Sequence, residues 1–281
     1  MEPGDELTMS SKNSQISPDM TLSYQNRKID RSLVANNVVA GFRLGVQNFT
    51  NAHHSYRLGL LWVLLDPLFR AAVFSFLMIV IRGNTSPESL VIGVFTIHAL
   101  NNSFSSSMNI SLSQEPFPLS HTPTFPLLIS KITSDILSAV FLGLAGSSII
   151  VLVSQSPIEV IAVIPVSCVI LSVIGSGSGI LLSRFVTVAK DISKIIGYLL
   201  FLGFFLQCVL YPYSMTEGYH RLILSYLPHT IIVEWCRSVA SNTLYPFSPW
   251  HAAKVLAIWG VPTMVGFFKY HNYRWRATSW S

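Results

Sequence analysis

Charged side chains are scarce in this sequence. Lys and Arg supply 18 of its 281 residues and Asp and Glu supply 13, so 11% of the chain is charged, whereas soluble domains carry about 25%. Five of the acids fall within the first thirty residues, which leaves the rest of the chain almost free of them. This composition argues against a soluble enzyme, a disordered chain or a nucleic-acid-binding protein. It predicts an integral membrane protein.

The usual sequence signs of chemistry are also missing. Cys168, Cys208 and Cys236 follow no metal-binding or disulfide spacing. There is no Gly-x-x-x-x-Gly-Lys-Ser/Thr phosphate loop, and the eight histidines form no readable set with Ser, Cys or Asp. We therefore expect no catalytic, cofactor-binding or metal-binding residues in this chain. The acidic N-terminus, which has no early apolar run, predicts no signal peptide.

What the sequence does contain is a series of apolar segments long enough to cross a bilayer, which takes about 20 residues. We predict an all-α fold with six transmembrane helices, at Leu60–Ile81, Leu90–Leu112, Pro126–Val153, Pro157–Ser183, Ile195–Tyr211 and Trp250–Phe268. The stretch 213–249 is too apolar for a free loop and too interrupted to span. We expect it to form short helices at the outer face, of the re-entrant kind.

The segment before the first span has a different texture. Residues 1–25 are polar and are predicted to be a disordered tail. From Ile29 to Ala52, Val34, Val38, Phe42 and Val46 recur every four residues. This spacing predicts an amphipathic helix lying in the membrane interface. A helix packed on a soluble partner is the alternative reading.

Basic residues predict the orientation, because they are enriched on the cytoplasmic side. With six spans, one side receives Lys12, Arg27, Lys28, Arg31, Arg43, Arg57, Lys131, Arg184, Lys190, Lys194, Lys269, Arg274 and Arg276, whereas the other receives Arg82, Arg221, Arg237 and Lys254. The bias predicts a multi-pass protein of the cytoplasmic (inner) membrane with both termini in the cytoplasm.

Two pairs of opposite charges are spaced four residues apart, so each pair shares a helix face. Asp66 and Arg70 fall inside the first span and form a predicted intramembrane ion pair, either structural or lining a wet cavity. Asp135 and Lys131 at the start of the third span favour a structural pair.

Small and polar residues mark two of the predicted spans. The polar second span, 101–113, should face other helices or a water-filled pathway. The glycine-rich tract 175–179 in the fourth span favours close helix packing over nucleotide binding.

One tract resembles a known family. The run Tyr56–Leu68, with Arg57 and the spacing of Gly59, Trp62 and Pro67, is similar to the segment that opens the first span of type-2 ABC exporter permeases, the polysaccharide (O-antigen, capsule and teichoic acid) group in particular. Weaker similarities follow in chain order, in the segments 115–119, 190–192 and 208–212. Lys190 stands in place of the family's Arg, and Gln207 and Cys208 replace its Ser-Pro.

The resemblance implies that residues 26–275 form a type-2 ABC transmembrane domain. Two copies would form a channel for a lipid-linked glycan, driven by a separate ATPase subunit that binds ATP and Mg. The chain itself would not be an enzyme. The implied ATPase-coupling residues are Arg57, Glu115, Pro116, Phe117 and Pro118, and the candidate channel residues are Trp62, Phe69, Phe74, Phe201 and Phe205.

Several alternatives to this reading stay open. Each candidate channel aromatic could instead contact lipid or pack between helices, and the proline-rich segment 115–119 could be an ordinary turn. The cargo could be a small amphiphile or a drug. An ATP-independent carrier is a further alternative, although the sequence shows no inverted repeat.

Overall fold

The computed structural model describes residues 31–54, 59, 61–82, 87–110, 124–154, 156–189 and 191–277. Within this part of the chain every regular element is helical, which confirms the predicted all-α class. The elements are α2 (Arg31–His54), α3 (Leu61–Arg82), α4 (Pro87–Met108), α6 (Thr124–Ser154), α7 (Val160–Val188), α8 (Asp191–Leu206), η1 (Tyr213–Met215), α9 (Gly218–Ser225), α10 (Pro228–Ala240) and α11 (Pro249–Ala277).

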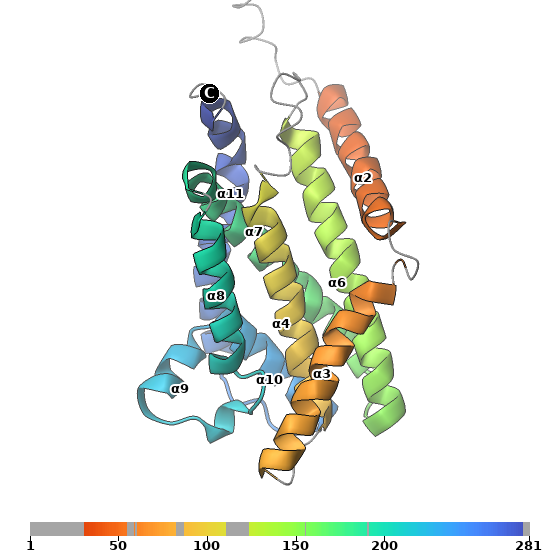
Figure 1. The fold of residues 1–281 in the computed structure, drawn as a ribbon, viewed down its shortest axis with the longest axis vertical. Coiled ribbons are helices and arrows are strands. Elements are labelled where there is room, and N and C mark those ends of the chain that lie inside the picture. The colour runs from red at the N-terminus through yellow and green to blue at the C-terminus, as the bar shows by residue number, and fades with distance from the viewer. Residues whose placement is uncertain are drawn as a thin grey trace, which may run out of the picture.

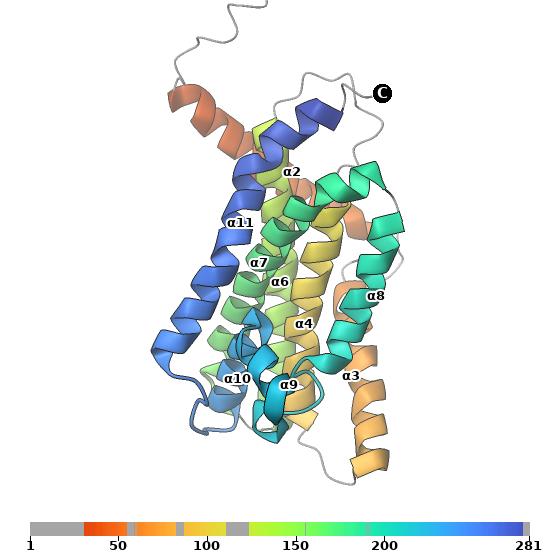
Figure 2. The same ribbon diagram turned by 90° about the vertical axis from the view of Figure 1, so that its left-hand side faces the viewer.

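Helix α7 lies at the centre of the bundle and packs against α4, α6, α10 and α11 (Figures 1 and 2). The short helices α9 and α10 lie at the end of the molecule opposite the C-terminal end of α11 (Figure 2). Three helices begin with proline, namely α4, α10 and α11. Proline suits the first helical position, because its fixed φ fits a helix and its missing N–H has no partner there.

The glycine tract of α7 brings helix backbones together, as the sequence predicted. A Cβ on Gly175 would lie 2.6 Å from the carbonyl oxygen of Leu100 on α4, and one on Gly177 would lie 2.5 Å from the Thr263 side chain on α11. Gly179 meets α4 again, one turn further along the same face of α7. Gly175 and Gly179 therefore let α7 approach α4 closely, and Gly177 lets it approach α11.

Three helices in the described part of the chain are long and apolar enough to cross a membrane, at Pro126–Leu152, Val160–Val186 and Pro249–Tyr270. They correspond to the third, fourth and sixth predicted spans. Helices also stand at the first, second and fifth predicted positions, but their role as spans stays a prediction. Helix α3 carries two charges within the predicted membrane region, and α8 has only 16 residues.

The predicted end of the fifth span is wrong by five residues. Helix α8 stops at Leu206, whereas we expected the helix to reach Tyr211. The Tyr211 hydroxyl donates to the Leu206 carbonyl oxygen at 2.6 Å, and the chain turns between these two residues. A side chain that satisfies the last carbonyls of a helix stabilises its termination.

Helix α2 packs on α6 through the face that carries its small residues, Gly41 and Gly45. Cβ atoms on Gly41 and Gly45 would lie 2.8 and 2.7 Å from the carbonyl oxygens of Pro126 and Ser130. The Asn48 amide donates to the Ser130 hydroxyl at 3.0 Å. The apolar stripe of α2 is left exposed, at Val38, Phe42 and Val46. Helix α2 thus contacts α6 through its glycines, and its hydrophobic face points away from the rest of the bundle.

The glycine contacts lead to a stability prediction for the bundle. In Gly179→Ala the added methyl would meet the Phe104 carbonyl oxygen and lie 3.1 Å from the Ser107 Cβ. We expect unfolding of the purified protein to become easier by about 1–3 kcal/mol, since overpacking forces backbone shifts. Thermal unfolding measures the change. The matched control is Gly197→Ala on α8, where nothing lies within 4 Å; equal losses in both variants would contradict the packing role.

Candidate functional site: the α3–α8 face

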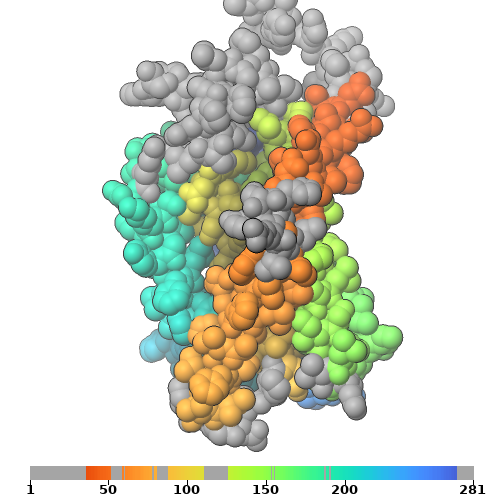
Figure 3. All heavy atoms as spheres, turned by 45° about the vertical axis from the view of Figure 1, so that its right-hand side comes forward, coloured from red at the N-terminus to blue at the C-terminus, as the bar shows by residue number. Residues whose placement is uncertain are grey.

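Helix α3 stands out from the bundle over α4, with α6 on one side and α8 on the other (Figure 3). Six of its exposed or half-exposed residues lie along one stripe, at spacings of four, three, four, three and four positions: Trp62, Asp66, Phe69, Val73, Phe76 and Val80. Leu61, Arg70, Leu77 and Ile79 are also exposed beside this stripe. Phe69 is 60% exposed and Phe76 is 67% exposed. Alternating three- and four-residue spacing is typical of a helix that packs along another helix. We call these outward residues of α3, together with the exposed residues of α8, the α3–α8 face.

The predicted Asp66–Arg70 pair forms and lies on this face. Arg70 Nε donates to Asp66 Oδ1 at 3.2 Å, and Nη2 lies 3.0 Å from Oδ2, a bidentate pair. The Asp66 side chain remains 45% exposed, and the Arg70 side chain remains 56% exposed. His98 on α4 adds a third group, with Nδ1 3.8 Å from Asp66 Oδ2. Sequence spacing does not connect His98 with this pair, because α3 and α4 are brought together by the fold.

A cluster of phenylalanine rings joins α3 to α8. The Phe74 ring lies 4.7 Å from that of Phe204 and 5.8 Å from that of Phe205, and Phe205 lies 5.2 Å from Phe201. Edge-on and tilted ring pairs of this kind are favourable. Of the five predicted channel residues, the structure brings Phe74, Phe201 and Phe205 together. Trp62 and Phe69 lie on the outward stripe of α3, separate from this cluster.

Behind this face, a polar network ties α4 to α6 and α7. Asp135 on α6 pairs with Lys131 and accepts hydrogen bonds from Ser176 at 2.6 Å and Ser107 at 3.3 Å. Ser103 and Ser172 bond each other at 2.6 Å. The polar stretch of the second predicted span therefore faces other helices, one of its two predicted settings. The predicted pair of Asp135 and Lys131 forms, and its structural role stays a prediction.

The short helix α10 is fastened to α4 and to the turn after α8 by one buried arginine. Arg237 donates to the carbonyl oxygens of Val209 at 2.9 Å, Ser89 at 3.1 Å and Tyr211 at 3.2 Å. It also pairs with Glu234 at 2.7 Å, and Glu234 accepts the Tyr213 N–H at 3.1 Å. Charge-assisted bonds to several carbonyls hold this corner together. The sequence marks Arg237 only as one of the few basic residues on the predicted non-cytoplasmic side, because the carbonyl groups that it binds are far apart in the sequence.

The remaining predicted residues cannot be placed. Arg57 and the segment Glu115, Pro116, Phe117 and Pro118 lie outside the described residues, as does the tail 1–25. No group of three or more His, Cys, Asp or Glu side chains suited to a metal ion occurs in the part of the chain that the structure describes.

Burial keeps the phenol of Tyr245, which lies near Glu234, neutral. The Tyr245 hydroxyl donates to the Ile231 carbonyl oxygen at 3.0 Å. Burial, followed by the charge of Glu234, raises the pKa of Tyr245 to about 12. The phenol therefore acts as a fixed hydrogen-bond donor that closes the loop between α10 and α11.

Comparison with protein-family models gives no match to this chain, and comparison with curated proteins gives none either. The fold and composition place the chain among all-α proteins whose helices can cross a membrane. Its resemblance to type-2 ABC permeases rests on the sequence motifs alone.

The two aspartate pairs differ in burial, and we predict different consequences of breaking them. Asp135→Leu leaves Lys131 and the serines without their acceptor in a buried place. We expect it to cost about 3–5 kcal/mol of stability, because an unpaired buried charge is costly. Asp66→Leu breaks an exposed pair and should cost about 0–1 kcal/mol. Chemical unfolding of the two purified variants measures both, and a reversed order would contradict the assignment.

Proposed function

We propose that this chain is the permease subunit of an ATP-driven exporter that moves a lipid-linked polysaccharide across the cytoplasmic membrane. The observation that carries the proposal is the Asp66–Arg70 pair, half exposed on a helix whose other outward residues are apolar. A charged side chain in contact with hydrocarbon costs about 2.5–3.5 kcal/mol on insertion scales. The α3–α8 face is therefore better suited to meet water, cargo or a partner helix than lipid.

The motif evidence supports the same function. The tract Tyr56–Leu68, which resembles the type-2 permeases, runs directly into α3 and includes Asp66. Helices occur at the position of the interfacial helix, at the six span positions and in the segment before the last span. This order is the one that the resemblance implies. The six-span topology and the cytoplasmic termini belong to this proposal.

The row of outward residues on α3 that begins at Trp62 and ends at Val80 is called the α3 stripe. Its partner would be a second copy of the chain. The alternating spacing of Trp62, Phe69, Val73 and Phe76 suits a helix that packs lengthwise against an equivalent helix. Two copies related by a twofold axis would bring the same stripe to both sides of one interface. The pathway would then lie between the α3–α8 faces of the two protomers.

The aromatic residues on these faces suit a sugar cargo. The apolar faces of a sugar ring stack on aromatic rings, and the hydroxyl groups exchange weak hydrogen bonds with polar neighbours. Phe201 and Phe205 on α8, and Phe69 on α3, are exposed for such contacts. The ATPase subunit, which would bind ATP and Mg, would dock on the cytoplasmic side at Arg57 and residues 115–118.

The function is tested by deleting the gene and analysing cell-surface glycan. We expect surface glycan to disappear and lipid-linked intermediates to accumulate inside the cell. In the complemented strain, Phe69→Ala should lower export by about two- to tenfold, the worth of one aromatic contact. Phe268→Ala on α11, another exposed phenylalanine, is the control and should export normally. Normal surface glycan in the deletion strain would refute the glycan cargo.

The second copy is tested separately by cysteine cross-linking in membranes. The native cysteines Cys168, Cys208 and Cys236 are buried and should not react. Val73→Cys, on the α3 stripe, should give a disulfide-linked dimer on mild oxidation. Val261→Cys on α11 is equally exposed and should not. Cross-linking through Val261→Cys but not through Val73→Cys would place the interface elsewhere.

A further inference from the structure

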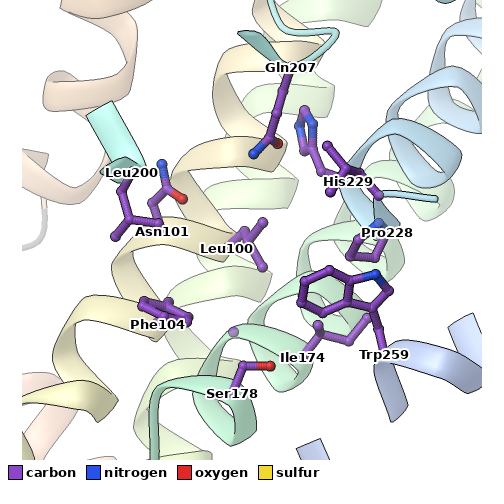
Figure 4. Close-up of a pocket in the computed structure, with 12 residues that line it drawn as sticks. Leu100, Asn101, Phe104, Ile174, Ser178, Leu200, Gln207, Pro228, His229 and Trp259 are labelled. Carbon is purple, nitrogen blue, oxygen red and sulfur yellow. The ribbon is translucent and has the colours of Figure 1, made fainter. Parts of the chain in front are cut away.

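A cavity of about 130 Å³ lies inside the protomer, between α4, α7, α8, α10 and α11. Gln207 and His229 stand at one end of it and Ser178 at the other, with Trp259 along one side and Asn101 and Phe104 across from it (Figure 4). The Trp259 indole N–H already donates to the Tyr226 carbonyl oxygen at 2.9 Å. Trp259 therefore offers this cavity its ring and no hydrogen bond.

Unpaired polar atoms gather at this cavity. Ser178 Oγ, Gln207 Oε1 and His229 Nδ1 are buried and have no hydrogen-bond partner among the described residues. All three residues line the cavity. His229 is 1% exposed and Ser178 is 8% exposed. Leaving a buried polar atom without a hydrogen-bond partner costs about 1–3 kcal/mol of stability. Three such atoms around one cavity therefore indicate that a bound molecule supplies their hydrogen bonds.

The tautomer of His229 follows from its neighbour. Thr96 Oγ1 has one hydrogen and donates it to the Ile92 carbonyl oxygen at 2.7 Å. His229 Nε2 lies 3.1 Å from the same Oγ1, and we assign Nε2 as the donor of that pair because Oγ1 then both donates to Ile92 and accepts from the ring. Burial and the nearby Arg237 lower the pKa of His229 to about 3, so the ring is neutral. Its Nδ1 is left as an acceptor that faces the cavity.

The occupant must therefore supply donors at the end where Gln207 Oε1 and His229 Nδ1 both accept. None of the described residues that line the cavity is Asp, Glu, Lys or Arg, so neither an anion nor a cation finds a counter-charge among them. A neutral molecule with hydroxyl groups meets these conditions, and Ser178 can donate to or accept from a further hydroxyl at the opposite end. The apolar walls between the two ends suit the faces of a ring.

We propose that this cavity is a binding site for a neutral six-membered ring that carries several hydroxyl groups, such as a single sugar ring. Its volume of about 130 Å³ limits the occupant to a single ring, because an engineered cavity of about 150 Å³ accepts one benzene ring. The site lies within one protomer and is distinct from the exposed α3–α8 face. Its existence does not depend on the proposed export function.

Water is the competing occupant. At about 30 Å³ per molecule the cavity would hold about four waters, which could also donate to Gln207 and His229. Water and a ring differ in one measurable respect, because only a ring competes with other ring compounds for the space. A binding experiment therefore decides between them.

The test uses the full chain in lipid nanodiscs, because a maltoside detergent carries such a ring itself. Methyl β-D-glucopyranoside is the probe, and saturation-transfer-difference NMR titration reports its binding. We expect saturable binding that dodecyl maltoside abolishes by competition. Maltotriose distinguishes two sources of the ring. If maltotriose binds as strongly as the methyl glucoside, the site accepts the terminal unit of a sugar chain. If maltotriose binds more weakly, the site prefers a free small glycoside. Either result requires the probe itself to bind.

Two variants on different elements connect the binding to the cavity. Gln207→Leu and Ser178→Ala each remove one hydrogen-bonding group and should weaken the probe by about three- to tenfold. The control Gln47→Leu changes an exposed glutamine on α2 and should leave the binding unchanged. Thermal unfolding of each variant checks the fold, and having two variants keeps the test valid if one of them fails to fold.

Three results would overturn the proposal. The first is no saturable binding of the probe, which leaves water as the occupant. The second is binding that both cavity variants leave unchanged. The third is displacement of the probe by cyclohexanol at equal concentration, since one hydroxyl should not match several. None of these results bears on export, because the assay contains no ATPase and no transported cargo.

Discussion

The close approach of α7 to α4 and α11 is the constraint on which the rest of the structure depends. Glycines at positions 175, 177 and 179 leave no room for side chains between these backbones. The approach of α7 to α4 brings the Ser103–Ser172 hydrogen bond within reach, and Ser176 on α7 donates to Asp135 on α6. These four polar side chains are satisfied by neighbouring helices, as buried polar groups must be where water is excluded. The central helix fixes the frame, and α3 and α8 attach to its outside.

The attachment of α3 and α8 explains why the candidate site differs in character from the core. The core is closed by backbone contacts and paired serines, whereas Phe74 on α3 meets α8 through the rings of Phe204 and Phe205. Apart from these ring contacts, both helices present many exposed apolar side chains. A face of this kind can accept a second protomer or a cargo more easily than a tightly hydrogen-bonded one can.

Local patterns in the sequence predicted the helices well, because apolar runs and glycine spacing act within one helix. The glycine tract of α7 and the pair of Lys131 with Asp135 could both be read from short spacing. The end of α8 could not, because the bond from Tyr211 to Leu206 depends on how the chain turns. The contact of His98 with Asp66, and the cavity at His229, depend on residues far apart in the sequence. The outward residues of α3 were not predicted as a stripe, because their exposure depends on the fold.

The fastening of α10 by Arg237 has a consequence for how α8 can move. The turn that follows α8 is bound to Arg237 through Val209 and Tyr211. Near the other end of α8, the Ser193 hydroxyl donates to Asn109 Oδ1, one residue beyond α4, at 2.9 Å. A charge-assisted cluster resists opening more than a single neutral bond does. Helix α8 is therefore held more firmly at its C-terminal end, where Phe201, Phe204 and Phe205 lie, than at its N-terminal end.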